Sequence, residues 1–203
     1  MITYITDYQP DFSHRDPDEG VAEFLWQRWS PRSFKKVEIP EETLTTIVDA
    51  ARWSTSCFNE QPWLIMTSST PEEFALYHSL LTEKNRVWTV NASVLGFMVA
   101  RRTFAYNRKP NRWAAFDTGS AWMCLTLQAR EFGLYTHGMG GIKVAEIHRQ
   151  LAIPEEEYEV ICGFAIGVLD LPEKLPTEDL REREVPSERK PLSEIWRHGR
   201  LGE

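Results

Sequence analysis

The chain has 203 residues, of which 42% are apolar and 12% aromatic. This composition is sufficient for the core of one medium-sized domain and excludes a disordered or fibrous protein. The net charge of -7 argues against nucleic acid and anionic membrane surfaces as partners, because their phosphate groups would be repelled.

The N-terminus lacks a basic region followed by an apolar stretch, and the longest apolar run, 92–100, is too short to span a membrane. Cys57, Cys124 and Cys162 are widely spaced, and the chain has no C-x-x-C motif. Neither a disulfide framework nor a zinc site is therefore expected. These features predict a cytoplasmic protein without a bound metal.

The predicted elements alternate between helices and strands. Val21, Phe24, Leu25 and Arg28 have helical spacing after the acidic stretch 16–19, which predicts a first helix ending near Arg28. A second helix is expected to begin at Pro40 and to bury one apolar stripe. The later strands are expected at 63–67, 94–100, 133–136 and 160–168, and the later helices from 71, over 118–132 and over 143–151.

Apolar residues occur all round the helix predicted at 118–132, which indicates burial within the core or at a subunit interface. Taken together, the elements predict an α+β fold in which a sheet is flanked by helices.

The character of the chain changes after Leu169, where prolines and alternating charges replace apolar periodicity. We expect residues 1–169 to form a single domain and residues 170–203 to be an extended arm that wraps a neighbouring subunit. A solvated tail is the alternative. The apolar residues Leu192, Ile195 and Trp196 favour docking.

Two segments carry the main functional signal. Arg28–Phe34 reads R-W-S-P-R-S-F and places two guanidiniums and a hydroxyl within five positions, a combination that suits a phosphate. Ser54–Trp63 reads S-T-S-C-F-N-E-Q-P-W and combines amides and hydroxyls with proline and tryptophan, which together can hold a flat ring with polar edges. The two segments resemble the opening signature of the FMN-dependent nitroreductase family. Thr55 and Cys57 depart from it, standing where proline and serine are usual.

The resemblance assigns roles to both segments. It implies a homodimer with a nitroreductase-like α/β sandwich, a central mainly antiparallel sheet, and FMN at the subunit interface. Contacts to the flavin phosphate, ribityl chain and pyrimidine edge fall to Arg28, Trp29, Ser30 and Arg32. Contacts from the partner subunit fall to Thr55, Ser56, Cys57 and Asn59. For either arginine alone, the alternative is a cation that suits the dipole of a helix C-terminus.

Three further stretches extend the resemblance. Lys84–Trp88 is similar to a G-N-x-x-W element and implies that Asn85 faces the flavin ring, with an ordinary turn residue as the alternative. Gly133–Ile142 is similar to a turn whose backbone N–H groups approach flavin N5 and O4, which implies roles for Met139, Gly140 and Gly141. Many relatives carry a glutamate where Gly140 stands. The pair Arg189 and Lys190 is similar to a C-terminal basic element that returns to the phosphate, with a solvated charge pair as the alternative.

The function implied by the resemblance is FMN-dependent oxidation and reduction. NADH or NADPH would reduce the flavin by hydride transfer, and a nitroaromatic, quinone or similar acceptor would take the electrons in a ping-pong mechanism. Arg32 is the candidate for stabilising the reduced flavin, and no side-chain acid or nucleophile is required. His137 is either a proton source or a structural histidine. The alternatives are dehalogenation, azole oxidation or flavin cleavage on the same fold, or a non-catalytic flavin-binding module.

Overall fold

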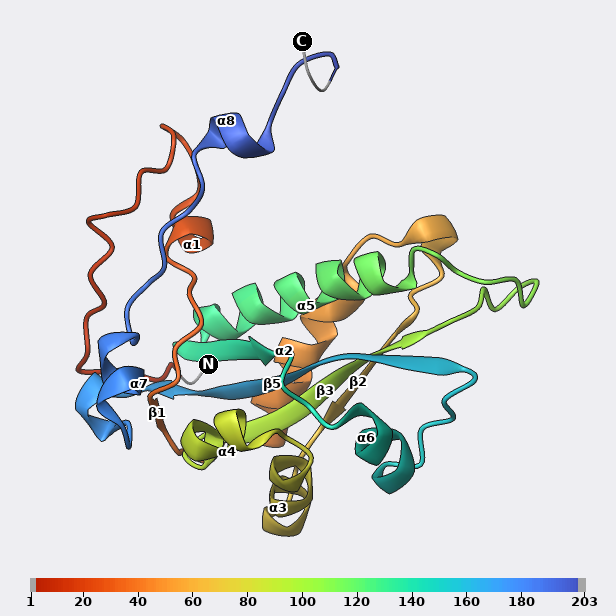
Figure 1. The fold of residues 1–203 in the computed structure, drawn as a ribbon, viewed down its shortest axis with the longest axis horizontal. Coiled ribbons are helices and arrows are strands. Elements are labelled where there is room, and N and C mark those ends of the chain that lie inside the picture. Colours follow the sequence, from red (N-terminus) through yellow and green to blue (C-terminus); the bar gives the residue numbers. More distant parts are fainter. Residues whose placement is uncertain (1–2, 201–203) are drawn as a thin grey trace.

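A mainly antiparallel sheet with helices on both faces forms the body of the protein (Figure 1). The structure is a computed structural model and describes residues 3–200. It confirms the α+β class predicted from the sequence. Within the described residues, no helix has both the length and the apolar character needed to cross a membrane.

Strand β5 (Tyr158–Leu169) is the centre of the sheet. It pairs with β3 (Val94–Arg101) along one edge and with β4 (Leu134–Met139) along the other, antiparallel in both cases. Beyond β3 lies β2 (Trp63–Thr67), and the two-residue strand β1 (Phe34–Lys35) pairs with the last residues of β5. The long β5 therefore connects β1, which follows the arginine-rich segment, to β4.

Helices cover the two faces of the sheet separately (Figure 1). Helices α2 (Glu41–Arg52) and α5 (Ala114–Glu131) pack together on one face. The other face carries α3 (Pro71–Ser79), α4 (Glu83–Thr89) and α6 (Val144–Gln150). Because both faces are covered, β3 is buried on either side and reads as a nearly continuous apolar run.

Helices α2, α3, α5 and α6 form where the sequence predicts them, whereas α4 forms in a stretch where no helix was predicted. In α2 the residues Leu44, Ile47 and Ala51 are buried against one core. Helix α3 begins at a capping box formed by Thr70 and Glu73, which satisfies backbone donors at its first turn. In α5 one side is buried and the remainder is half-buried or exposed, so the subunit alone does not bury this helix on most sides.

The first predicted helix is much shorter than expected. Helix α1 spans only Glu23–Trp26 and buries none of its residues. Val21, Phe24 and Leu25 are 42%, 51% and 43% exposed, because no other segment within residues 3–200 covers that apolar stripe. An amphipathic helix of this length depends on packing for its stability, so the predicted first turns do not form.

The arm after β5 begins with two short helical turns that the sequence did not predict. The 3-10 turn η2 (Pro172–Lys174) and helix α7 (Glu178–Glu182) place Leu175 and Leu180 in the core. From residue 185 the arm runs beside the N-terminal segment to the short helix α8 (Leu192–Ile195), seen in blue in Figure 1, and the chain continues beyond this helix. The apolar side chains of the α8 region are exposed and enter no core formed by residues 3–200.

Candidate functional site

An arginine-rich cavity of about 460 Å³ lies between the segment before β1, strand β4 and the arm. Arg28, Ser30 and Arg32 line it from the first of these segments. His137 lines it from β4, and Arg189 lines it from the arm. The fold thus brings together predicted site residues from both ends of the chain.

The cavity has an excess of positive charge. Within residues 3–200, Arg28 and Arg189 form no ion pair with a carboxylate. Arg28 donates to Ser30 Oγ, and Arg189 donates to the carbonyls of residues 187 and 188. Burial, followed by the charge of Arg189, lowers the pKa of the Arg28 guanidinium. Glu182 is also in the lining, yet the arginines outnumber it. Such a site suits a dianion such as a phosphate monoester.

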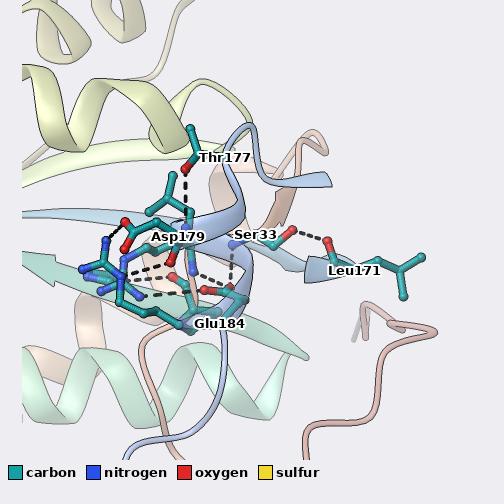
Figure 2. Close-up of polar contacts among 10 residues, drawn as sticks. Ser33, Leu171, Thr177, Asp179 and Glu184 are labelled. Carbon is teal, nitrogen blue, oxygen red and sulfur yellow. Dashed lines mark hydrogen bonds and ion pairs between the residues drawn. The ribbon is translucent and has the colours of Figure 1, made fainter. Parts of the chain in front are cut away.

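A buried carboxylate holds the arginine-rich segment in place. Glu184 is fully buried, and its Oε1 accepts the backbone N–H groups of Arg32 and Ser33 at 2.6 and 2.7 Å. Its Oε2 lies 3.8 Å from Arg32 Nη1, and Ser33 Oγ donates to the carbonyl of Leu171. Figure 2 shows these contacts joining the arm to the segment before β1. The arm therefore fixes the backbone from which Arg32 projects into the cavity.

Sequence reasoning missed Glu184. It stands in the run R-E-R-E at 181–184, where nothing distinguishes one glutamate from the next. Burial raises its pKa, while the hydrogen bonds from Ser33 and Arg32 act in the opposite direction. Only the tertiary contact with the backbone of residues 32 and 33 identifies its role.

His137 joins two segments at the cavity wall. Its Nδ1 lies 2.9 Å from the carbonyl oxygen of Pro31, and its ring centroid lies 4.6 Å from that of Trp88. Burial lowers its pKa to about 4, so the ring is neutral at pH 7 and Nδ1–H donates to Pro31. This bond ties the arginine-rich segment to β4.

We expect acid to destabilise the protein in part through His137. Its pKa is about 4 in the folded state against 6.5 in the unfolded state, so the unfolded state binds the extra proton between these values. The free energy of unfolding should therefore fall as the pH drops from 6.5 towards 4, by an amount on the order of 3 kcal/mol. His137→Asn keeps a donor for Pro31 but removes the titration, so urea unfolding at pH 7 and pH 5 should show a smaller loss. An equal loss in both proteins would contradict this account, and His198→Asn in the arm is the control.

A glycine turn follows β4 directly. The carbonyl oxygen of Gly141 accepts three hydrogen bonds, from Thr82 N, Thr82 Oγ1 and Asn85 Nδ2, at 3.0, 3.0 and 2.9 Å. A Cβ atom on Gly141 would lie 2.6 Å from Asn85 Nδ2, whereas one on Gly140 would meet nothing within 4 Å. Asn85, from α4, thus holds the turn through its side-chain amide. No hydrogen-bond acceptor among residues 3–200 receives the N–H of Gly140 or Gly141.

The cavity and the turn lie along the same strand. His137 belongs to β4 and Gly140 follows three residues later, a separation of about 10 Å at the usual rise of a strand. Guanidinium groups line the cavity at the His137 end of this stretch. At the other end are the unbonded N–H groups of Gly140 and Gly141, with unfilled space next to Gly140. The arrangement fits a ligand with an anionic tail and a flat head.

Comparison with known proteins agrees with this geometry. The nitroreductase family model matches residues 25–87 and 67–168. The chain belongs to the nitroreductase family. It is 41% identical to a solved structure described as an oxidoreductase containing FMN, with a TM-score of 0.87 over 92% of this chain and 96% of that one. Among curated proteins, none matches the chain.

More distant structures share the fold. An FMN-dependent nitroreductase from Clostridium difficile R20291 is 24% identical over 77% of this chain and 91% of that chain, with a TM-score of 0.63. An enone reductase from gut-bacterial fatty acid saturation metabolism is 20% identical over 75% and 90%, with a TM-score of 0.65. At these identities the likeness extends to the architecture alone.

The second signature segment of this member of the nitroreductase family lies away from the cavity. Thr55, Ser56, Cys57 and Asn59 surround the 3-10 turn η1 (Cys57–Asn59), where the N–H of Cys57 donates to Asp117 Oδ2 at 3.1 Å. Asp117 stands in the first turn of α5, about 14 Å along the helix from Thr126, whose side chain contacts β4. One subunit does not bring these four residues to its own arginine cavity.

The backbone around η1 is strained. Phe58, Asn59 and Gln61 have φ angles of 54°, 58° and 49°, the left-handed region that L-residues rarely adopt. Ser56 Oγ accepts the N–H of Gln61, and the carboxylate of Glu60 accepts the N–H of Ala105. In this conformation the Phe58 side chain is 78% exposed to solvent. Strain that the surroundings maintain in this way is typical of functional segments.

The remaining predicted residues differ in their placement. Trp29 lines the cavity but is only 3% exposed and packs against Tyr135. Met139 is buried in the core, so only its backbone is available to a ligand. Lys190 is exposed, pairs with Glu194 at 3.5 Å and is absent from the cavity lining. Arg15 lines the cavity, although no motif in the N-terminal stretch pointed to it.

Proposed function

We propose that the protein is an FMN-dependent oxidoreductase. The observation that carries this proposal is the placement of an arginine cavity and a glycine turn along β4, at the two ends of one elongated site. When bound, FMN would accept hydride from NADH or NADPH. The reduced flavin would then pass the electrons to a nitroaromatic, quinone or similar acceptor, which makes the mechanism ping-pong. The FMN named for the 41% identical relative supports the choice of cofactor.

The residues present fit such a cofactor. Arg28 and Arg189 would bind its phosphate, because their guanidiniums reach the cavity without a carboxylate partner among residues 3–200. The N–H groups of Gly140 and Gly141 would orient the reactive edge of the ring. Arg32 would stabilise the negative charge of the reduced ring, with the carboxylate of Glu184 offsetting part of its field.

We further propose that the active unit is a homodimer. Apolar side chains of α1 and of the α8 region are exposed in the subunit, including Phe24 at 51%, Ile195 at 69% and Trp196 at 56%. A second subunit would cover them, and the arm would wrap that subunit from residue 185 onwards. The same association would deliver residues 55–59 to the partner's flavin.

The experiment that tests this function is spectroscopic. Purified protein, reconstituted with FMN, should be yellow, and anaerobic NADH or NADPH should bleach it. Adding a nitroaromatic, a quinone or an enone in separate cuvettes should restore the colour and rank the acceptors. Bound flavin that nicotinamide fails to bleach contradicts the proposal and favours other chemistry on the same fold, and failure to bind FMN contradicts the choice of cofactor.

A further inference from the structure

We propose that Arg15 is a third phosphate-binding residue and makes the site select a phosphorylated flavin over riboflavin. The inference rests on the proposed function and adds a residue from the N-terminal segment, outside every motif described above.

The contacts place Arg15 between the two segments that supply the other arginines. Its Nη1 donates to the carbonyl oxygen of Arg28 at 3.0 Å and also contacts that of Trp26. Its Nε donates to the carbonyl oxygen of Ser187 at 3.2 Å, two residues before Arg189. Figure 1 shows the N-terminal segment in dark red running beside the blue arm. Arg15 therefore joins the backbone carrying Arg28 to the backbone carrying Arg189.

One donor of Arg15 is left over after these contacts. Nη2 is buried and has no hydrogen-bond partner among residues 3–200, although the side chain lines the cavity. Leaving a buried guanidinium donor unsatisfied is unfavourable, and a phosphate oxygen in the cavity would satisfy it after a small rotation of the Arg15 side chain, because Nη2 is shielded in its present position.

The positive charges next to Arg15 also favour a bound phosphate. Burial, followed by the charges of Arg189 and Arg28, lowers the pKa of Arg15. Three guanidiniums that repel one another are held in place by backbone carbonyls, for Arg15 and Arg189, and by Ser30 Oγ, for Arg28. No carboxylate is bonded to any of the three among residues 3–200. A dianionic phosphate would turn this repulsion into attraction, which is the physical basis of the proposed selectivity.

A purely structural role makes a different prediction. His14 Nε2 lies 2.7 Å from the carbonyl oxygen of Pro186, so residues 14 and 15 together bind the arm through hydrogen bonds to its backbone, a contact called the clasp below. A clasp that only shapes the site would affect FMN and riboflavin equally, because both share the ring and the ribityl chain. A phosphate contact would affect FMN alone.

The test compares the dissociation constants of FMN and riboflavin, measured by quenching of flavin fluorescence. Arg15→Gln should weaken FMN binding about 10-fold to 30-fold and leave riboflavin within about twofold, as expected for one charge-assisted contact. Arg15→Lys should be intermediate, because it keeps the charge but loses the planar fork. His14→Ala loosens only the clasp and should keep the ratio of the two constants. Arg149→Gln, on the exposed surface of α6, makes the same change in net charge elsewhere.

Two outcomes overturn the proposal: unchanged FMN binding in Arg15→Gln, or an equal loss for both flavins. If Arg15→Gln does not fold, the same comparison with Arg15→Lys decides. If the wild-type protein binds neither flavin, the proposed cofactor is wrong, and inorganic phosphate becomes the probe. Phosphate should then raise the melting temperature of the wild type more than that of Arg15→Gln, and equal shifts would overturn the anion site as well.

Discussion

Replacing Arg28 with alanine should weaken FMN binding about 100-fold, a loss of about 3 kcal/mol, without a comparable effect on riboflavin. Arg28 lines the cavity, has no carboxylate partner among residues 3–200, and is held towards Ser30 Oγ at 3.2 Å. Two parallel charge-assisted hydrogen bonds to a phosphate would account for a loss of this size. Fluorescence titration with each flavin measures it.

The controls for Arg28→Ala separate charge from geometry. Arg28→Lys should recover part of the affinity, because an ammonium supplies the charge but not the planar fork. Arg149→Ala removes an exposed arginine of α6 and should change neither constant. Raising the salt concentration should weaken FMN binding more in the wild type than in Arg28→Ala. FMN binding that survives Arg28→Ala intact would mean that the cavity is not the phosphate site.

Parts of the fold could be predicted because their local pattern and their tertiary environment agree. The stripe of α2 and the apolar run of β3 face a core within the same subunit, so periodicity alone locates them. Helix α1 has an equally clear stripe, but no surface formed by the described part of the chain covers it, and only four residues are helical. Helix α7 forms in a charged stretch without periodicity because Leu180 alone reaches the core.

The site residues likewise fall into those that the sequence could locate and those that it could not. Motif resemblance located Arg28, Ser30 and Arg32, whose spacing is local, and the structure brings them to one cavity with Arg189. It could not locate Arg15 or Glu184, because their roles depend on contacts with backbone far away in the sequence. A glutamate in a charged run and an arginine in an aperiodic segment look like surface residues until the chain folds.

Glu184→Ala should lower the free energy of unfolding by about 4 kcal/mol. The substitution leaves the N–H groups of Arg32 and Ser33 without their acceptor, and Ser33 is only 1% exposed. It also leaves Arg32 without its carboxylate partner at 3.8 Å. Urea unfolding at fixed protein concentration, in the absence of flavin, gives the change directly.

Glu184→Gln isolates the charge from the hydrogen bonds. Its amide oxygen still accepts both backbone N–H groups, so the loss near pH 7 should be only about 1 kcal/mol. The pH dependence adds a second test, because burial raises the pKa of Glu184 above its ordinary 4.5. Between 4.5 and the raised value the folded state binds more protons, so Glu184 makes stability fall as the pH rises, and Glu184→Gln should lack this slope. A glutamine variant as unstable as Glu184→Ala would show that the charge, rather than the two backbone hydrogen bonds, holds the arginine segment against the arm.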